Sequence, residues 1–311
     1  MKKYCFGVDV GGTTIKMGLF DTDGNVLDKW EIVTRTENNG ENVLPDIAEA
    51  VKNKMAEKSI AKEDVAGVGV GVPGPVDSKG IVHRCVNLGW DEFNVNEKLG
   101  ALVDMPVMAG NDANVAALGE MWRGGGQGHE DLVVVTLGTG VGGGIIINGK
   151  MLTGANGSGG EIGHIHVQDG EPDTCGCGNN GCLEQYASAT GIVRLAKRAL
   201  AKTSQATVLN ADSVTAKDVW DAVKDGDAVA IEVAEQFGKY LGEGLAAIAG
   251  VVNPEAFVIG GGVSKAGEIL LSYVEKNYKP VVFHGSRDVE FTLATLGNDA
   301  GIFGAAKLIL G

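Results

Sequence analysis

The segment Tyr4-Cys-Phe-Gly-Val-Asp-Val-Gly-Gly-Thr-Thr-Ile-Lys-Met-Gly-Leu-Phe20 sets the architecture of the chain. Its two ends, residues 4–10 and 15–20, are rich in β-branched and aromatic residues, which is typical of strands. Between them lies Gly11-Gly12-Thr13-Thr14, where the glycines allow the backbone to turn tightly. We therefore predict two strands joined by a glycine and threonine tip, followed by a third strand over 26–33.

The same pattern returns in the middle of the chain. Residues 131–137 (Asp-Leu-Val-Val-Val-Thr-Leu) and 143–148 (Gly-Gly-Ile-Ile-Ile-Asn) flank a second tip, Gly138-Thr139-Gly140. This repetition indicates an internal duplication at low similarity. Backbone N–H groups and threonine hydroxyls at two such tips would suit the phosphates of a nucleotide.

The rest of the chain alternates between helical and strand patterns. Val43, Ile47 and Val51 lie four residues apart, which predicts an amphipathic helix. Asn94 with Glu97 predicts a capping box, Asp112 is expected at a strand end and helix start, and Ser264 is expected to cap a helix. Helices are predicted over 41–58, 113–122, 186–201, 215–224, 227–250 and 299–310, and strands over 65–72, 105–109, 256–263 and 289–293. This alternation predicts an α/β fold with mixed sheets.

Composition excludes several classes of function. The chain has 311 residues, 44% of them hydrophobic and 21% charged, with a formal net charge of −14. That charge opposes binding to nucleic acid or to an anionic membrane, because both need clustered Lys and Arg. No apolar run is long enough for a signal peptide or a membrane span, so we expect a cytoplasmic protein with reduced thiols.

Three cysteines and a histidine predict a metal site. Cys175-Gly-Cys177-Gly-Asn-Asn-Gly-Cys182 follows His164 by eleven residues. Three thiolates and one imidazole form the tetrahedral ligand set of a closed Zn²⁺ site. The alternatives are a disulfide remnant and simple packing, but Cys-Gly-Cys has little apolar surface to pack. Cys5 and Cys85 are interpreted as structural thiols.

Acidic residues flank this metal site on both sides. Glu161 precedes His164 by three residues and Glu184 follows Cys182 by two, so the metal would hold the three side chains close together. Two carboxylates beside a fixed imidazole suit the hydroxyl groups of a polyol.

Two glycine patterns resemble nucleotide motifs without fulfilling them. Gly138-x-Gly140-x-x-Gly143 matches a dinucleotide fingerprint, but it opens a predicted strand where that motif opens a helix. The segment 144–150 resembles a P-loop, but Met151 stands where a magnesium-binding Ser or Thr is required. Both assignments are rejected.

Taken together, the motifs closely resemble those of the ROK family of sugar kinases, in the family's order and over almost the whole chain. They are Asp9-Val-Gly-Gly-Thr-Thr14, Asn87-Leu-Gly-Trp90, Gly110-Asn-Asp-Ala-Asn114, Gly138-Thr-Gly140, Glu161-Ile-Gly-His164, Cys175–Glu184 and Gly260-Gly-Gly262. The second and third of these resemble the zinc-containing glucokinases of bacteria. The resemblance implies the actin-like ATPase (ribonuclease H-like) fold, with two α/β domains around a cleft. The expected domains are residues 1–112 with 299–311, and residues 113–298 carrying the zinc site.

The resemblance also implies roles for individual residues. Contacts with ATP or its Mg²⁺ are implied for Asp9, Gly11, Gly12, Thr13, Thr14, Gly138, Thr139, Gly261 and Gly262. Contacts with the hexose are implied for Asn87, Asn111, Asp112, Glu161, His164 and Glu184. Phosphoryl transfer needs a carboxylate that accepts the proton of the attacking hydroxyl, and Asp112 is the expected base. Asp9 beside the first glycine tip suits water-mediated Mg²⁺ binding better.

Some alternatives stay open at this point. The family includes kinases for N-acetylglucosamine, N-acetylmannosamine or fructose, and a non-catalytic sugar sensor would share the fold. It also includes transcriptional repressors with a winged helix ahead of the kinase-like part, for which we expect no room before residue 9. Polyphosphate could replace ATP as the donor, and a homodimer is expected from the family alone.

Overall fold

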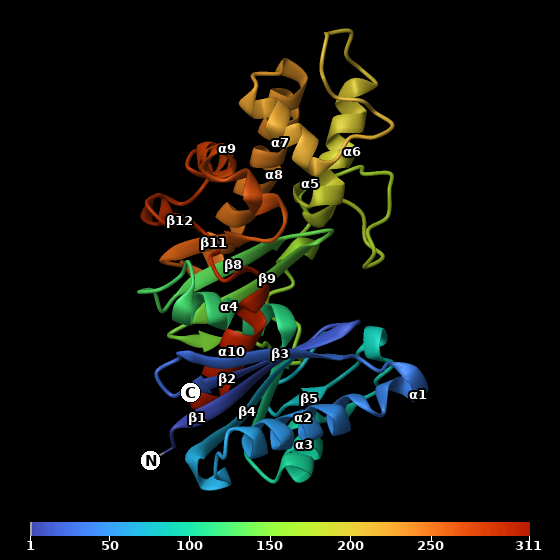
Figure 1. The fold of residues 1–311 in the computed structure, drawn as a ribbon. Coiled ribbons are helices and arrows are strands. Elements are labelled where there is room, and N and C mark those ends of the chain that lie inside the picture. Colours follow the sequence, from blue (N-terminus) through green and yellow to red (C-terminus); the bar gives the residue numbers. More distant parts are fainter. Residues whose placement is uncertain (1) are drawn as a thin grey trace. The chain divides into compact units, whose positions relative to one another are not determined.

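Two five-stranded sheets form the centre of the fold in the computed structural model, which describes residues 2–311 (Figure 1). The first sheet has the order β3 (Val26–Val33), β2 (Thr14–Asp21), β1 (Tyr4–Val10), β4 (Val65–Val72) and β7 (Val107–Asn111). The second has the order β10 (Lys150–Met151), β9 (Val141–Ile147), β8 (Leu132–Leu137), β11 (Ala256–Gly260) and β12 (Glu290–Leu293). The short strands β5 (Ile81–Val82) and β6 (Phe93–Asn94) pair with each other.

Both sheets follow the same plan. Numbered within each sheet, the strands lie in the order third, second, first, fourth, fifth. In both, the first strand pairs in parallel with the fourth, and the fourth with the fifth. Parallel neighbours need long crossover connections, which here contain helices. The duplication predicted from the two glycine tips is therefore present in the topology.

Ten α-helices accompany these sheets in residues 2–311. They are α1 (Glu37–Gly40), α2 (Val43–Glu57), α3 (Val95–Val103), α4 (Asp112–Arg123), α5 (Glu184–Ala187), α6 (Ala189–Leu200), α7 (Ala216–Lys224), α8 (Ala228–Val252), α9 (Glu268–Tyr278) and α10 (Ala300–Leu310). None of them, among the described residues, is long and apolar enough to cross a membrane.

The chain divides into two compact units. The first contains Met1–Glu130, Gly144–Gly160 and Leu296–Gly311, and the second contains Asp131–Gly143 and Glu161–Thr295. Helix α4 belongs to the first unit, which continues to Glu130, whereas the expected first domain ended at residue 112. The C-terminal helix α10 belongs to the first unit.

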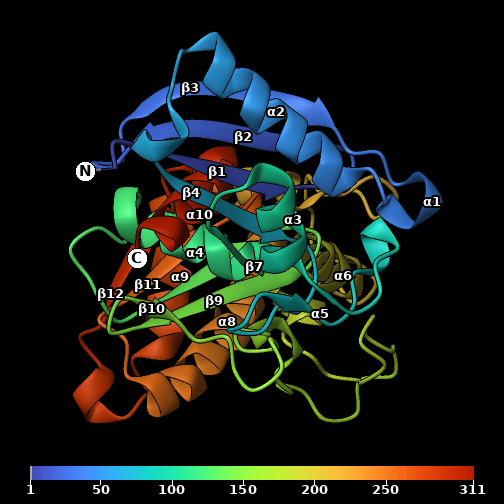
Figure 2. The ribbon, with the colours of Figure 1, turned by 90° about the horizontal axis from the view of Figure 1, so that it is seen from below.

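Glycines allow α10 to approach the first sheet closely. A Cβ at Gly69 of β4 would lie 1.7 Å from the carbonyl oxygen of Ala305, and one at Gly304 would lie 1.6 Å from that of Val115 in α4. Any side chain would force these elements apart. Figure 2 shows α2 on one face of the first sheet and α10 on the other, so both faces are covered.

Several local predictions differ from the structure. The strand expected over 105–109 runs two residues later, from Val107 to Asn111. Asp112 lies where it was expected, directly after β7 and at the first position of α4. The N-cap of α4 is Asn111, whose backbone is extended and whose side chain accepts from the Asn114 N–H at 3.1 Å. Ser264 caps no α-helix: it lies within the 3₁₀ helix Val263–Ala266 and donates its hydroxyl to the Gly261 carbonyl at 2.8 Å.

Other local predictions are confirmed in part. Asn94 caps α3 by accepting from the Glu97 N–H at 3.1 Å, which is the N-cap half of the predicted capping box. The helix predicted over 186–201 is present in two pieces, because Ser188 adopts an extended conformation and starts a new helix.

Candidate functional site

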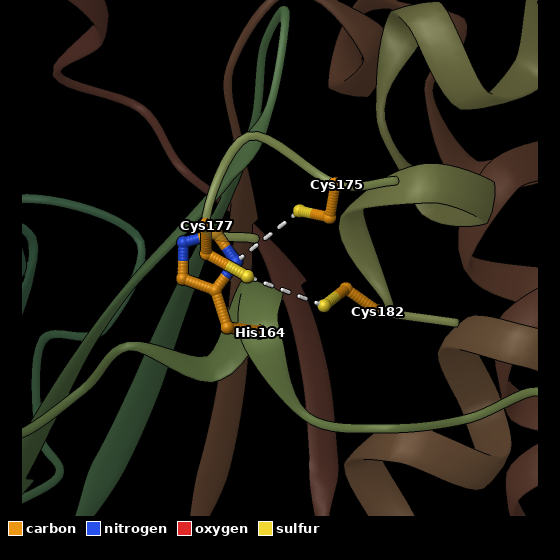
Figure 3. A group of neighbouring side chains, drawn as sticks. All are labelled: His164, Cys175, Cys177 and Cys182. Carbon is orange, nitrogen blue, oxygen red and sulfur yellow. Dashed lines mark hydrogen bonds between the residues drawn. The ribbon is translucent and has the colours of Figure 1, made fainter. Parts of the chain in front are cut away.

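The predicted metal ligands lie together in the second unit. Their donor atoms, the Nδ1 or Nε2 of His164 and the sulfurs of Cys175, Cys177 and Cys182, all lie within 4.8 Å of one another. Figure 3 shows the four side chains pointing toward a common centre. The Cys177 and Cys182 sulfurs are 3.6 Å apart, and the Cys175 sulfur is 3.7 Å from His164 Nδ1. Tetrahedral zinc with bonds of about 2.0–2.3 Å separates its ligand atoms by roughly 3.5–3.8 Å. The cluster is therefore consistent with a zinc site.

Tight turns bring these ligands together. The Cys175 N–H donates to the Asn179 carbonyl at 2.7 Å, and the Gly178 N–H donates back to the Cys175 carbonyl at 2.9 Å. Gly178 and Gly181 adopt φ of +93° and +78°, which residues with a side chain seldom reach. Burial raises the pKa of the Cys182 thiol to about 12, so a metal must displace protons to bind there.

His164 presents one ring nitrogen to the cluster and the other to Glu161. Its Nδ1 faces Cys175, and its Nε2 lies 4.0 Å from the Oε2 atom of Glu161. The Glu161 side chain is 56% exposed and that of His164 is 34% exposed. A metal on Nδ1 would fix the imidazole and leave Nε2–H as a directed donor.

Glu184 contacts protein groups with both carboxylate oxygens. Oε1 accepts from the Cys175 sulfur at 3.5 Å, and Oε2 accepts from the Val141 N–H at 3.1 Å. Both contacts lie within the protein and involve no ligand. The contact of Glu184 with a hexose therefore stays a prediction.

The glycine residues expected to bind nucleotide in the second unit lie next to each other. Gly138–Gly140, here called the glycine turn, is closed by the Gly138 N–H donating to the Gly140 carbonyl at 3.0 Å. Gly261 has φ of +84°, and a Cβ there would lie 2.5 Å from the Leu137 carbonyl oxygen. The two segments meet because the parallel strands β8 and β11 end at the same edge of their sheet.

The corresponding tip of the first unit joins β1 to β2. The Gly11 N–H donates to the Thr14 carbonyl at 3.0 Å, and the Thr34 hydroxyl donates to the Gly11 carbonyl at 2.7 Å. Gly12 and Thr13 lie between them, and Asp9 lies near the end of β1. Burial raises the pKa of the Asp9 carboxyl above its usual value, and Lys16 partly opposes this.

Asn111 and Asp112 lie at the junction of β7 and α4. The Asn111 amide donates to the Gly74 carbonyl at 3.1 Å and to Asp112 Oδ1 at 3.0 Å, and the same oxygen accepts from the Ala113 N–H at 2.8 Å. These bonds orient the Asp112 carboxylate at the end of a parallel strand, where α/β proteins place ligand-binding groups.

Asn87 occupies the tip of a separate turn in the first unit. It is exposed within the 3₁₀ helix Val86–Leu88. Cys85 and Trp90 close this turn by exchanging two backbone hydrogen bonds of 3.0 Å.

A buried ionic cluster beside the metal ligands was not predicted from the sequence. Glu171 accepts from Arg198 Nη1 at 3.0 Å and Nη2 at 2.7 Å, and also from the hydroxyl of Tyr186. These contacts lower the pKa of Glu171 to about 2, mainly through the hydrogen bonds from Arg198. They tie the loop between His164 and Cys175 to α5 and α6. Glu171 and Arg198 are 27 residues apart in the sequence, and no local pattern points to their pairing.

Comparisons with known proteins agree with this geometry. The model of the ROK family matches residues 5–311. The glucokinase of Halalkalibacterium halodurans is 44% identical, over 99% of this chain and 95% of that protein. The crystal structure of a ROK hexokinase from Thermus thermophilus is 34% identical with a TM-score of 0.80, over 97% of this chain and 96% of that one. A ROK family glucokinase from Streptomyces griseus, solved in complex with glucose and AMPPNP, is 36% identical with a TM-score of 0.71 over 98% of both chains.

These similarities cover the chain from one end to the other. They confirm the actin-like ATPase fold that the motifs implied, with its two mixed sheets of five strands. They extend over both glycine tips, the Asn111-Asp112 junction and the metal cluster. The chain belongs to the ROK family.

Proposed function

We propose that this protein transfers the γ-phosphoryl group of ATP to the 6-hydroxyl of glucose, giving glucose 6-phosphate and ADP. The observation that carries the proposal is the full-length similarity to a glucokinase at 44% identity. The related Streptomyces griseus enzyme, which was solved with glucose and AMPPNP, supports both substrates. One structural zinc ion held by His164 and the three cysteines belongs to the proposal, as does Mg²⁺ bound with ATP.

Asp112 acts as the general base. Its carboxylate is oriented by the Asn111 amide and the Ala113 N–H, as expected of a group that must meet one hydroxyl. It accepts the proton of the glucose 6-hydroxyl while that oxygen attacks the γ-phosphorus, and the bond to the β,γ-bridging oxygen breaks to release ADP. Mg²⁺ bound with ATP would neutralise the phosphate charge. Asp9 would hold this ion through water molecules.

The remaining residues bind and orient the two substrates. Glu161 and Glu184 suit sugar hydroxyls, because an ionised carboxylate accepts hydrogen bonds and every hydroxyl can donate one. His164 would donate from Nε2 to a neighbouring hydroxyl, which its Nδ1 contact with the cysteines supports. Asn87 and Asn111 complete the hexose set. The nucleotide set consists of Gly11, Gly12, Thr13, Thr14, Gly138, Thr139, Gly261 and Gly262.

A coupled assay of ADP release across a panel of hexoses tests this proposal. Glucose should give the highest kcat/KM, ahead of fructose, N-acetylglucosamine and N-acetylmannosamine, and NMR of the product should place the phosphate on the 6-hydroxyl. Replacing ATP with polyphosphate tests the donor. Preference for another sugar, phosphorylation at the 1-hydroxyl, or hydrolysis without sugar dependence would refute the proposal. A homodimer in the cytoplasm is part of the same proposal, and light scattering measures the oligomeric state.

A further inference from the structure

Glu184 connects the metal cluster to the glycine turn. It is the first residue of α5, two positions after the metal ligand Cys182. Its Oε1 atom lies 3.5 Å from the Cys175 sulfur. Its Oε2 atom accepts at 3.1 Å from the N–H of Val141, the residue that directly follows the glycine turn. A single carboxylate therefore contacts both the metal cluster and the turn.

The start of α6 donates hydrogen bonds to carbonyl oxygens of the same turn. The Ala189 N–H donates to the Gly138 carbonyl at 2.8 Å, and the Thr190 hydroxyl donates to the Thr139 carbonyl at 2.8 Å. Residues 184–190 thus make three hydrogen bonds to the backbone of residues 138–141. These bonds leave the turn little freedom to change its conformation.

Close packing fixes the turn further. A Cβ at Gly140 would lie 2.0 Å from the Oε2 atom of Glu184, and a Cβ at Gly163 would lie 2.1 Å from the Val141 carbonyl oxygen. Only glycine allows these approaches. The Glu184 carboxylate therefore lies directly against the turn at Gly140. The residue before His164, Gly163, lies directly against Val141, which follows the turn.

We propose that Glu184 is a positioning residue for nucleotide binding: by holding Val141, it fixes the backbone of the glycine turn in the conformation that receives the phosphates. The inference rests on the proposed function, in which Gly138 and Thr139 contact the nucleotide. Backbone donors that are fixed in advance lose less conformational freedom on binding, so ordering the turn raises affinity. This role is separate from any hexose contact, because it acts on nucleotide affinity when no sugar is present.

Titration calorimetry with Mg²⁺ and a non-hydrolysable ATP analogue, without sugar, tests the role. E184A should bind the analogue about tenfold more weakly, equivalent to about 1.4 kcal/mol. E184Q should bind it close to wild type, because its amide oxygen accepts from Val141 while its N–H faces the Cys175 sulfur. E232A removes an exposed carboxylate from α8 of the same unit and should leave the affinity unchanged.

Zinc content and thermal unfolding of each variant separate positioning from damage to the metal site. Glu184 is not one of the four metal ligands, so E184A should keep the zinc content of wild type. If E184A loses metal or fails to fold, the T190V variant tests instead whether ordering of the glycine turn controls nucleotide affinity. It removes the bond to the Thr139 carbonyl without changing a metal ligand, and it should also weaken nucleotide binding.

Three results would overturn the inference. The first is a folded E184A that binds the ATP analogue as tightly as wild type. The second is an E184Q that binds it as weakly as E184A, and the third, where E184A cannot be measured, is a T190V with wild-type affinity. A wild-type protein that binds no nucleotide would refute the proposed function and this inference with it. Normal nucleotide binding by wild type together with an unaffected E184A would refute the inference alone.

Discussion

Replacing Glu171 by glutamine should destabilise the second unit by about 3 kcal/mol. Glu171 is only 6% exposed and accepts hydrogen bonds from two nitrogens of Arg198, from the Asp173 N–H at 3.1 Å and from the Tyr186 hydroxyl. Glutamine keeps the volume of the side chain but removes its charge. Its amide nitrogen would also place a donor against the donors of Arg198 or Tyr186.

The magnitude follows from the pKa of Glu171. The hydrogen bonds from Arg198 lower it from 4.5 to about 2. This difference corresponds to about 3 kcal/mol at neutral pH, since each tenfold change in proton affinity contributes about 1.4 kcal/mol. Removing one partner of a buried ion pair costs about 3–5 kcal/mol, and the lower end applies because Arg198 is 37% exposed and can be hydrated.

Urea unfolding monitored by circular dichroism and by tryptophan fluorescence measures the effect. Trp220 is the tryptophan of the second unit, so its fluorescence reports on the affected transition. K217A, which breaks the exposed pair between Lys217 and Asp221, is the matched control and should cost no more than about 0.5 kcal/mol.

The pH dependence has a defined sign. Because folding lowers the pKa of Glu171, its contribution is complete above 4.5 and is lost as the pH falls toward 2. The stability difference between wild type and E171Q should therefore shrink on acidification through this range. A loss no larger than that of K217A, or a difference that stays constant down to the lowest pH at which the protein folds, would refute the reasoning.

Four further outcomes are expected. D112N should bind glucose like wild type and lose on the order of 10²- to 10⁴-fold in kcat, the range for removing a general base, and near-normal turnover would exclude Asp112 from that role. Glu161→Ala should weaken glucose binding by about 1–3 kcal/mol in calorimetry while affinity for an ATP analogue stays unchanged, and equal glucose affinity would contradict the assigned contact. Cys177→Ser should lower the zinc content found by metal analysis, whereas stoichiometric zinc in this variant would remove Cys177 from the ligand set. Asp9→Asn should raise the melting temperature of the nucleotide-free protein at pH 7, because burial raises the pKa of the native carboxyl and the ionised form disfavours folding. That gain in melting temperature should shrink as the pH approaches about 4, where Asp9 of the unfolded chain also becomes protonated. A lower melting temperature of Asp9→Asn than of wild type at pH 7 would contradict this prediction.

Features set by short segments of the sequence were predictable. Strands β1 and β3 have the predicted bounds, because their apolar pattern is local and glycine or polar residues end it. The metal cluster was also predictable, since three of its ligands lie within eight residues and the fourth is eleven residues away. In these cases the chemistry of neighbouring residues is sufficient.

Features that depend on packing between distant segments were not predictable. Asn111 and Asp112 are both good capping residues, and the extension of β7 to Asn111 decides which one caps α4. The bond from Val141 to Glu184 joins residues 43 positions apart, and the pair of Glu171 and Arg198 joins residues 27 apart. Such contacts require the tertiary fold, because no period or spacing in the sequence encodes them.

The place of α10 in the first unit has a consequence for biosynthesis. The helix covers one face of the first sheet, yet a ribosome translates it only after the whole of Asp131–Thr295. The second unit consists only of segments that precede residue 296, so it can fold while translation continues. The face of β4 that α10 covers therefore stays exposed until residues 300–310 emerge from the ribosome, and surface exposed in this way during synthesis is prone to aggregation.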